Sequence, residues 1–586
     1  MNLGLDRILH CVRNLPRNPI HNLRIVHVTG TNGKGSVCAL ITSALVASGY
    51  RTGTFNSPHF IHPCDAIRIN DRPISPEEYQ SIVDQIQAWE VIIELRHGLG
   101  GSPVSPGFPA LTQFEKTTVV ALCWFMLNCV DIVVLEVGMG GRRDATNIFD
   151  VGDPEPSPLI SRQDLFNIAG KKMVEFWYKD RQDLSSSSPT TSLLQQVAPL
   201  VGSRQPRSMV QCITAISIDH IELIGNSITE IAGEKAGIIR SGSVVVIGPQ
   251  PNAEMVVPIL QAEAQAKRAM RVIDASQGYT QIPAVPSEDS EAGHWSGAIR
   301  VRWPRDSNDD NDNGNGSDSS EFIELPLVLK GGYQAGNANT AYQALLALKR
   351  DFGWDKVSPR SLTLGFQAVN WPGRLSTLRV PIQNLRHLWP SAFNASGDDK
   401  RQLTVLADGA HNPAAAAALR DHVQCIAAPR KAESSTTANA EGSEDQQPSL
   451  RRRVRWVLGL TKGKDVRQIL ELLVNDKDRD EVWFVPFNKP DGMPWISSVE
   501  PQECLECLEA AMAQRHSSSA TVSDDDRGCR VQARAFSEGL AQVLPLLIEE
   551  QAAEDNAGKY PLTVVCGSLY LVADLYRLLN VSPWSQ

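Results

Sequence analysis

Residues 26–38 read Val-His-Val-Thr-Gly-Thr-Asn-Gly-Lys-Gly-Ser-Val-Cys, a β-branched run that leads into glycines, a lysine and a serine. The apolar residues before Gly30 predict a buried strand, and the apolar periodicity after Ser36 predicts a helix. A strand, a glycine turn and a helix N-terminus form a cradle in which backbone N–H groups and a lysine bind nucleotide phosphates. The spacing differs from the common GxxxxGK[ST] motif, because Gly35 follows Lys34 where a metal-binding hydroxyl usually stands.

The composition is that of a globular protein with several domains. At 586 residues the chain has room for a few domains of about 150 residues each. The net charge of −10 argues against a nucleic-acid or anionic membrane partner. The eleven cysteines show no paired framework, and residues 1–9 show no signal- or transit-peptide pattern, so we expect a cytoplasmic protein. The apolar stretch 119–135 is interpreted as helix, turn and buried strand rather than a membrane span.

Helical patterns alternate with β-branched runs along nearly the whole chain, which predicts an α/β fold with largely parallel sheets. Strands are expected at 24–29, 131–137, 212–218, 243–247, 403–407, 456–460, 481–486, 530–535 and 562–566. The Trp371-Pro372-Gly373 break predicts a boundary there, with domains 1–369 and 370–586. Polar insertions or loops are expected at 152–208, 306–320, 432–449 and 517–527. The first of these is either a genuine insertion or a gene-model artefact, since so long a structureless loop is improbable in a compact domain.

Two polar segments follow predicted strands. Glu136 comes directly after the buried run 132–135, and Asp219-His220 follows the run 215–218. In open parallel sheets ligands bind at the carboxyl edge of the strands. A carboxylate and an imidazole at neighbouring strand ends could bind Mg²⁺ together with nucleotide phosphates, because Mg²⁺ takes few protein ligands. For His220 alone, a structural histidine is the competing interpretation.

Nine motifs occur in the order seen in the dihydrofolate synthase/folylpolyglutamate synthase family of the Mur ligase superfamily, and the chain resembles that family. They are Gly30–Ser36, Ser57–His59, Glu136–Asn147, Asp219-His220, Glu234–Ile238, Gly336–Thr340, Trp371–Leu375, Asp408–Pro413 and Cys566–Ser568. Segments 4–8, 492–496 and 566–571 are most similar to the fungal dihydrofolate synthase branch. The resemblance implies an N-terminal P-loop ATPase domain of Mur ligase type, a C-terminal Rossmann-like α/β domain, and an active site in the cleft between them.

The resemblance also implies site residues. ATP would be bound by Gly33, Lys34, Gly35, Ser36, Asn337, Arg374, Asp408 and His411. Mg²⁺ would be bound by Ser57, Glu136 and His220, and the pterin substrate by Phe114, Glu115, Arg143 and Asp144. Lys34, His220 and Lys235 would be catalytic. Lys235 matches a lysine that is carbamylated in relatives, although a plain helix lysine is the competing interpretation, and a monovalent cation is a further implied cofactor. The chain departs from the family at Arg143 and Phe60, where leucine is common.

The implied activity is that of an ATP-dependent acid–amino-acid ligase. A dihydrofolate synthase transfers the γ-phosphoryl group of ATP to the carboxylate of 7,8-dihydropteroate, and the amine of L-glutamate then displaces phosphate. Two alternatives stay open: a folylpolyglutamate synthase, which extends reduced folates, and a non-catalytic nucleotide-binding paralogue. All three use small molecules, and we expect a monomer with no nucleic-acid or membrane partner.

Overall fold

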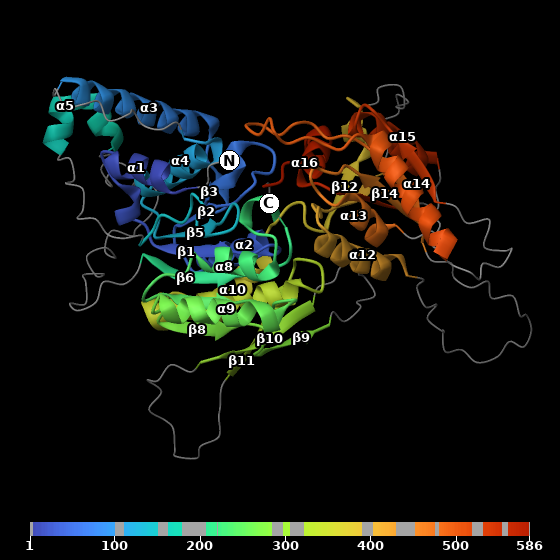
Figure 1. Ribbon diagram of the computed structural model, residues 1–586, viewed down its shortest axis with the longest axis horizontal. Coiled ribbons are helices and arrows are strands. Elements are labelled where there is room, and N and C mark those ends of the chain that lie inside the picture. Colours follow the sequence, from blue (N-terminus) through green and yellow to red (C-terminus); the bar gives the residue numbers. More distant parts are fainter. Residues whose placement is uncertain are drawn as a thin grey trace, which may run out of the picture. The chain divides into compact units, whose positions relative to one another are not determined.

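The computed structural model describes residues 4–99, 111–150, 162–177, 207–219, 221–283, 297–304, 321–388, 402–428, 452–474, 480–518, 531–553 and 561–584. They form two compact units (Figure 1). Unit 1 runs to Trp371, and unit 2 begins at Pro372 and also includes Leu329–Gly332. Each unit is built around its own sheet.

Unit 1 contains an eight-stranded sheet with the order β4-β3-β2-β5-β1-β6-β7-β8. Its parallel strands are β1 (Ile25–Thr29), β2 (Thr52–Phe55), β5 (Ile132–Glu136), β6 (Ser208–Ile213), β7 (Val244–Ile247) and β8 (Arg271–Asp274). The short strands β3 (Ile67–Ile69) and β4 (Arg72–Pro73) pair antiparallel at one edge. Every residue of β1, β5 and β6 is buried, as expected for a parallel sheet with helices on both faces.

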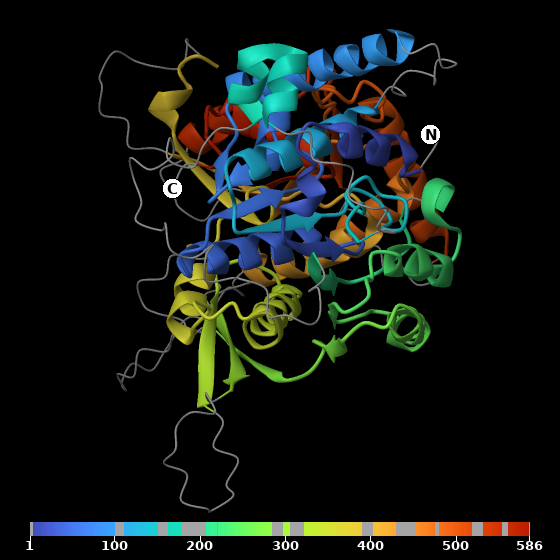
Figure 2. The same ribbon diagram turned by 90° about the vertical axis from the view of Figure 1, so that its left-hand side faces the viewer.

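The helices of unit 1 are α1 (Asp6–Asn14), η1 (Pro19–His21), α2 (Lys34–Ala47), η2 (Pro63–Ala66), α3 (Pro76–Leu99), α4 (Gln113–Leu127), α5 (Arg162–Trp177), α7 (Ile221–Ile224), α8 (Ile228–Ala236), α9 (Ala253–Ala266), α10 (Gln334–Phe352) and α11 (Pro359–Ala368). A second, antiparallel sheet has the order β11-β10-β9. Its strands are β9 (Tyr279–Ile282), β10 (Gly297–Trp303) and β11 (Glu321–Leu327). Helices α10 and α11 contact this sheet, which lies at one end of unit 1 (Figures 1 and 2).

Helix α5 falls inside the segment predicted as an insertion. Its residues Met173, Val174 and Trp177 are buried in the same apolar cluster as α1, α3 and α4, and Trp177 is 0% exposed. Arg17 Nη1 also donates a hydrogen bond to the Trp177 carbonyl oxygen at 3.1 Å. This part of the segment is therefore integrated into the core of unit 1.

Unit 2 is built on a six-stranded sheet with the order β12-β13-β17-β14-β15-β16. β12 (Ser376–Pro381) is antiparallel to β13 (Gln402–Ala407), and the remaining pairs are parallel: β14 (Val454–Leu458), β15 (Glu481–Phe484), β16 (Gln532–Ala535) and β17 (Leu562–Cys566). Its helices are η4 (Ile382–Leu385), α12 (Pro413–Ala427), α13 (Val466–Leu473), α14 (Pro501–Ser518), α15 (Leu540–Ala553) and α16 (Leu569–Leu578). Because β17 returns between β13 and β14, the carboxyl ends of these three strands meet at a topological switch point.

The predicted α/β class with parallel sheets is confirmed. The stretch 119–135 contains the end of α4, a turn and β5, and no helix in the described ranges is long and apolar enough to cross a membrane. The strand expected at 212–218 was wrong in its position, because β6 ends at Ile213. The pairing of β6 with β1 stops there because β1 ends at Thr29. The next residue, Gly30, turns the chain away from the sheet and has a φ of +149°. The expected loops at 306–320 and 432–449, and most of 517–527, lie outside the described residues.

Candidate active site

The strand, glycine turn and helix predicted from residues 26–38 are present as β1, residues 30–33 and α2. Gly30 and Gly33 have φ angles of +149° and +92°, which only glycine adopts without strain. A Cβ atom on Gly30 would lie 1.9 Å from Thr214 Oγ1, so the turn packs closely against the segment after β6. That segment also fixes the turn, because Thr31 N and Asn32 N both donate to the Ala215 carbonyl at 2.9 and 3.2 Å.

The unusual glycine after Lys34 has a steric explanation. A Cβ atom on Gly35 would lie 2.3 Å from Cζ2 of Trp371, so the indole occupies the space that a side chain would need. Ser36, the next residue, is 4% exposed, and its Oγ accepts a hydrogen bond from Gln334 Nε2 at 3.3 Å. A Cβ atom on Gly33 would lie 2.5 Å from Oδ1 of Asn337. The structure therefore brings the predicted ATP-binding residue Asn337 to the glycine turn.

Two lysines converge on the same carbonyl oxygen. Lys34 Nζ donates to Gly30 O at 3.2 Å and to Thr31 O at 3.1 Å, while Lys235 Nζ donates to Gly30 O at 2.7 Å. Burial lowers the pKa of Lys235 to about 7, and the charge of Lys34 contributes in the same direction. The lowered pKa favours the neutral amine of Lys235 relative to an exposed lysine, and carbamylation of this residue stays a prediction.

Glu136 lies at the carboxyl end of β5, beside the end of β1, and is 4% exposed. Asn56 Nδ2 donates to Glu136 Oε2 at 2.7 Å. The residue after Asn56, Ser57, has a buried Oγ with no hydrogen-bond partner among the described residues. A carboxylate and an unpartnered hydroxyl are oxygen ligands of the kind that Mg²⁺ prefers, so the residues present fit such an ion.

His220 lies outside the described residues, so its predicted metal-binding and catalytic roles stay predictions. Its neighbour Asp219 is described, and its charge opposes the lowering of the Lys235 pKa. Within the described ranges no three His, Cys, Asp or Glu side chains form a metal cluster.

Two of the predicted substrate-binding carboxylates have internal partners. Glu115 accepts hydrogen bonds from Thr112 N at 2.7 Å and from Arg7 Nε at 3.2 Å. Asp144 accepts from Met139 N at 2.8 Å and Thr146 Oγ1 at 2.6 Å, and burial raises its pKa. These contacts order the start of α4 and the glycine turn after β5. Their assignment to substrate binding stays a prediction.

The other two predicted substrate-binding residues differ in burial and contacts. A Cβ atom on Gly138 would lie 2.5 Å from Phe114 Cζ, which places the Phe114 ring directly against the glycine turn after β5. Arg143 is exposed, and its Nε donates to Glu234 Oε1 at 3.3 Å. Arg143 is thus an exposed arginine paired with Glu234, and Phe114 is a half-buried ring packed on the turn; their assignment to substrate binding stays a prediction.

In unit 2 the residues predicted to bind nucleotide gather at the end of β13. Asp408 accepts hydrogen bonds from the backbone N–H groups of Leu375 and Ala410, both at 2.8 Å. Burial raises the pKa of Asp408, while the positive charge of Arg374 lowers it. A Cβ atom on Gly409 would lie 2.4 Å from Arg374 Nη1, and His411 Nδ1 donates to the Gly409 carbonyl at 2.8 Å. This unit therefore brings Arg374, Asp408 and His411 together.

Two residues beside Glu136 in unit 1, Asn56 and Arg68, were not predicted from the sequence. Asn56 is 3% exposed and links Glu136 to Arg68, whose Nη2 donates to Asn56 Oδ1. One signal was available: Arg68 interrupts the apolar run Ile67-Arg68-Ile69 of a buried strand, and a buried charge needs partners.

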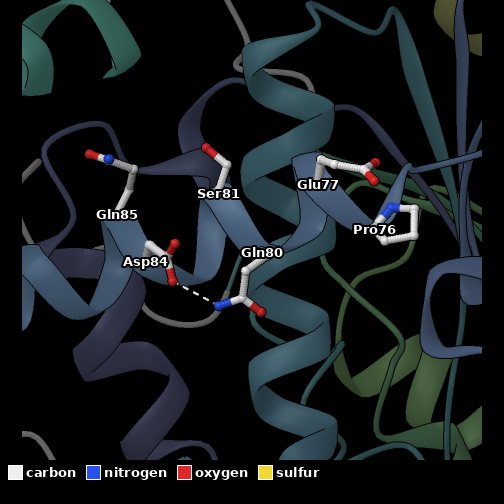
Figure 3. Close-up of a pocket in the computed structure, with 6 residues that line it drawn as sticks. All are labelled: Pro76, Glu77, Gln80, Ser81, Asp84 and Gln85. Carbon is white, nitrogen blue, oxygen red and sulfur yellow. Dashed lines mark hydrogen bonds between the residues drawn. The ribbon is translucent and has the colours of Figure 1, made fainter.

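A surface hollow of about 490 Å³ lies elsewhere, along one face of α3 (Figure 3). Its lining residues are Pro76, Glu77, Gln80, Ser81, Asp84 and Gln85. Gln80 Nε2 donates to Asp84 Oδ1 at 2.7 Å across it. None of the predicted site residues lines this hollow, and it combines no groups that suggest chemistry.

Comparison with known proteins finds similar sequences and a similar fold. The family model "Dihydrofolate synthetase, C-terminal domain" matches residues 391–578. Dihydrofolate synthetase from Saccharomyces cerevisiae is 27% identical over 99% of this chain and 98% of its own length. The probable dihydrofolate synthetase of Schizosaccharomyces pombe is 27% identical over 99% of both chains. The solved structure of Mycobacterium tuberculosis folylpolyglutamate synthase complexed with ADP shares the fold, with a TM-score of 0.62 and 24% identity over 99% of this chain and 95% of that one. The chain belongs to the dihydrofolate synthase/folylpolyglutamate synthase family.

Proposed function

We propose that this protein is a dihydrofolate synthase, which joins L-glutamate to 7,8-dihydropteroate at the expense of ATP. The observation that carries the proposal is the convergence of the glycine turn, two lysines and Glu136 at one edge of the unit 1 sheet. Such an edge suits phosphoryl transfer, which depends on positioning and on stabilisation of charge. The choice of dihydropteroate rests on the full-length similarity to two fungal proteins named dihydrofolate synthetase.

ATP is the nucleotide in this proposal, and Gly33, Lys34, Gly35, Ser36 and Asn337 of unit 1 bind it. The backbone N–H groups at the start of α2 would donate to the phosphates, and the helix N-terminus would add positive potential. Arg374, Asp408 and His411 are the proposed nucleotide-binding residues of unit 2. Phe114, Glu115, Arg143 and Asp144 are the proposed pterin-binding set.

Ser57, Glu136 and His220 are the proposed ligands of Mg²⁺. When bound, the ion would neutralise charge on the β- and γ-phosphates. Oε2 of Glu136 accepts a hydrogen bond from Asn56 Nδ2, and this contact orients the carboxylate. The buried Ser57 Oγ supplies the hydroxyl that Gly35 cannot, since Trp371 fills the space beside Gly35.

The reaction has two balanced steps. The pteroate carboxylate oxygen attacks the γ-phosphorus, which gives an acyl phosphate and ADP. The amine of L-glutamate then attacks the acyl carbon, loses a proton and expels phosphate as the amide forms. Lys34 stabilises the negative charge on the transferred phosphoryl oxygens. Lys235, as the free amine or as its carbamate, helps to organise the groups around the phosphates; a monovalent cation is a further proposed cofactor.

The test is a direct substrate comparison. Purified full-length protein is supplied with ATP, Mg²⁺ and L-glutamate, together with either dihydropteroate or tetrahydrofolate, and ADP release and product mass are measured. We expect dihydrofolate from the first mixture. Product from tetrahydrofolate alone would instead favour folylpolyglutamate synthase, which the fold similarity to the mycobacterial enzyme keeps as the second candidate. Nucleotide binding without any product would identify a non-catalytic paralogue.

A further inference from the structure

Arg68 is an arginine buried inside unit 1, with 2% of its surface exposed. It lies on β3, at the antiparallel edge of the sheet, and its Nη1 donates to the Asp65 carbonyl oxygen at 2.6 Å. Its Nη2 donates to Asn56 Oδ1. Its Nε also lies 4.0 Å from Asp71 Oδ1, so the buried guanidinium has an ion-pair partner on the same edge of the sheet in addition to these hydrogen bonds.

The hydrogen-bond chain from Arg68 has a direction. A guanidinium only donates, so the oxygen of the Asn56 amide must face Arg68 and the amide NH₂ must face away from it. That NH₂ donates to Glu136 Oε2 at 2.7 Å. Asn56 itself is held at the backbone, where its N–H donates to the Ala66 carbonyl at 3.0 Å. Arg68 therefore determines which face of Asn56 meets Glu136.

A second contact leads from Arg68 to the glycine turn. The guanidinium carbon lies 5.6 Å from the ring centroid of Trp371, within the range of a cation–π interaction. The same indole fills the space beside Gly35. One buried cation thus contacts both the side chain that holds Glu136 and the ring that packs on the phosphate-binding turn.

We propose that Arg68 is a positioning residue of the metal site, which acts through Asn56 to orient the Glu136 carboxylate and through Trp371 to hold that carboxylate in register with the glycine turn. The inference rests on the proposed function, in which Glu136 binds Mg²⁺. Groups that hydrogen-bond to metal ligands commonly change metal affinity by roughly 10- to 100-fold when they are removed. Asn56 is the residue that hydrogen-bonds directly to Glu136, and Arg68 would act on Glu136 indirectly, through Asn56.

The experiment is a double-mutant cycle on Mn²⁺ affinity, measured by electron paramagnetic resonance on the full chain. The variants are Asn56→Leu, Arg68→Met and the two combined. We expect about a 10-fold or greater loss of affinity in each single variant. If Arg68 acts through Asn56, the double variant should lose little more Mn²⁺ affinity than either single variant. Either substitution alone already removes the link from Arg68 through Asn56 to Glu136, so the two losses should not add. Full additivity of the two losses would overturn the proposal, and so would unchanged affinity in Arg68→Met.

Two further variants separate this role from folding and from the proposed function. Arg68→Lys keeps the charge but not the planar fork, so it should fold even if Arg68→Met does not, and should still bind Mn²⁺ more weakly. Ser48→Ala, at the C-terminal end of α2, removes a buried hydrogen bond of 2.9 Å from Ser48 Oγ to Ser361 Oγ and should lower stability without changing Mn²⁺ affinity. Glu136→Gln tests the proposed function itself. Loss of affinity there, with no loss in Arg68→Met or Arg68→Lys, would overturn only the present inference.

Discussion

Replacing Gly35 by alanine tests whether Trp371 is the reason for glycine after the loop lysine. A Cβ atom would lie 2.3, 2.8 and 3.1 Å from three atoms of the indole, all inside van der Waals contact. The ring is rigid and lies over the buried Arg68, so it cannot yield by rotating a flexible end. Either Trp371 leaves its position or the first turn of α2 moves.

The magnitude follows from two opposing effects. Alanine in place of a helical glycine stabilises by roughly 0.5–1 kcal/mol, whereas overpacking of a well-packed site costs about 1–3 kcal/mol. We therefore expect a net loss of about 1–2 kcal/mol in the free energy of unfolding. Because the displaced turn is the one proposed to bind phosphate, we also expect ADP affinity to fall by about 10-fold or more, equivalent to at least ~1.4 kcal/mol.

Urea unfolding followed by circular dichroism would measure the first effect, and calorimetric titration with ADP the second. Gly233→Ala is the matched control: Gly233 lies within α8, and a Cβ atom added there would have no neighbouring atom within 4 Å. The same substitution at that position should therefore stabilise by roughly 0.4–1 kcal/mol. Trp371→Leu added to Gly35→Ala should restore part of the ADP affinity. A Gly35→Ala protein as stable as its parent, with unchanged ADP affinity, would refute the steric explanation.

Four other predictions concern single side chains. Lys34→Ala should reduce the rate of ADP formation by at least ~10²-fold with an unchanged circular dichroism spectrum, and near-normal turnover would contradict its proposed role. Lys235 has a pKa of about 7 when folded against an ordinary value of 10.5, so the unfolded chain binds more protons between these pH values. The free energy of unfolding should accordingly rise from pH 7 to pH 9 relative to Lys235→Met in CO₂-free buffer, by on the order of 1 kcal/mol per pH unit. Parallel curves would mean that Lys235 stays charged in the folded protein and would contradict its lowered pKa. Trp177→Ala should destabilise unit 1 by about 3–5 kcal/mol, a loss that a peripheral or artefactual segment would not show in urea unfolding. Arg374→Ala should weaken binding of an ATP analogue, measured by equilibrium dialysis, by about 1.5–3 kcal/mol, and unchanged binding would remove Arg374 from the nucleotide site.

Local pattern was sufficient for the class of fold and for the position of the glycine turn. The β-branched runs before Gly30 and Glu136 predicted buried parallel strands, because periodicity and residue type are properties of short segments. The strand expected at 212–218 was misplaced for the opposite reason. Its apolar residues continue past Ile213, but its pairing partner β1 has already ended, and strand pairing is a long-range property.

Composition left open whether the segment 152–208, which is Pro- and Ser-rich at both ends, is a genuine insertion or a gene-model artefact. Its helix α5 carries Met173, Val174 and Trp177 into the core of unit 1. A hydrophobic residue in a polar surrounding gives no indication of what it will pack against. Burial of Trp177 depends on α1, α3 and α4, which lie far away in the sequence.

Contiguous residues and the order of short motifs were enough to predict the α/β architecture, the glycine turn after β1 and the family. Which distant residues contact one another could be seen only in the folded chain. It placed Trp371 beside Gly35, Lys235 on the carbonyl of Gly30, and Arg68 behind Asn56 and Glu136. These contacts join residues more than ten positions apart, and they follow from sheet order and close packing, which no local pattern of residues encodes.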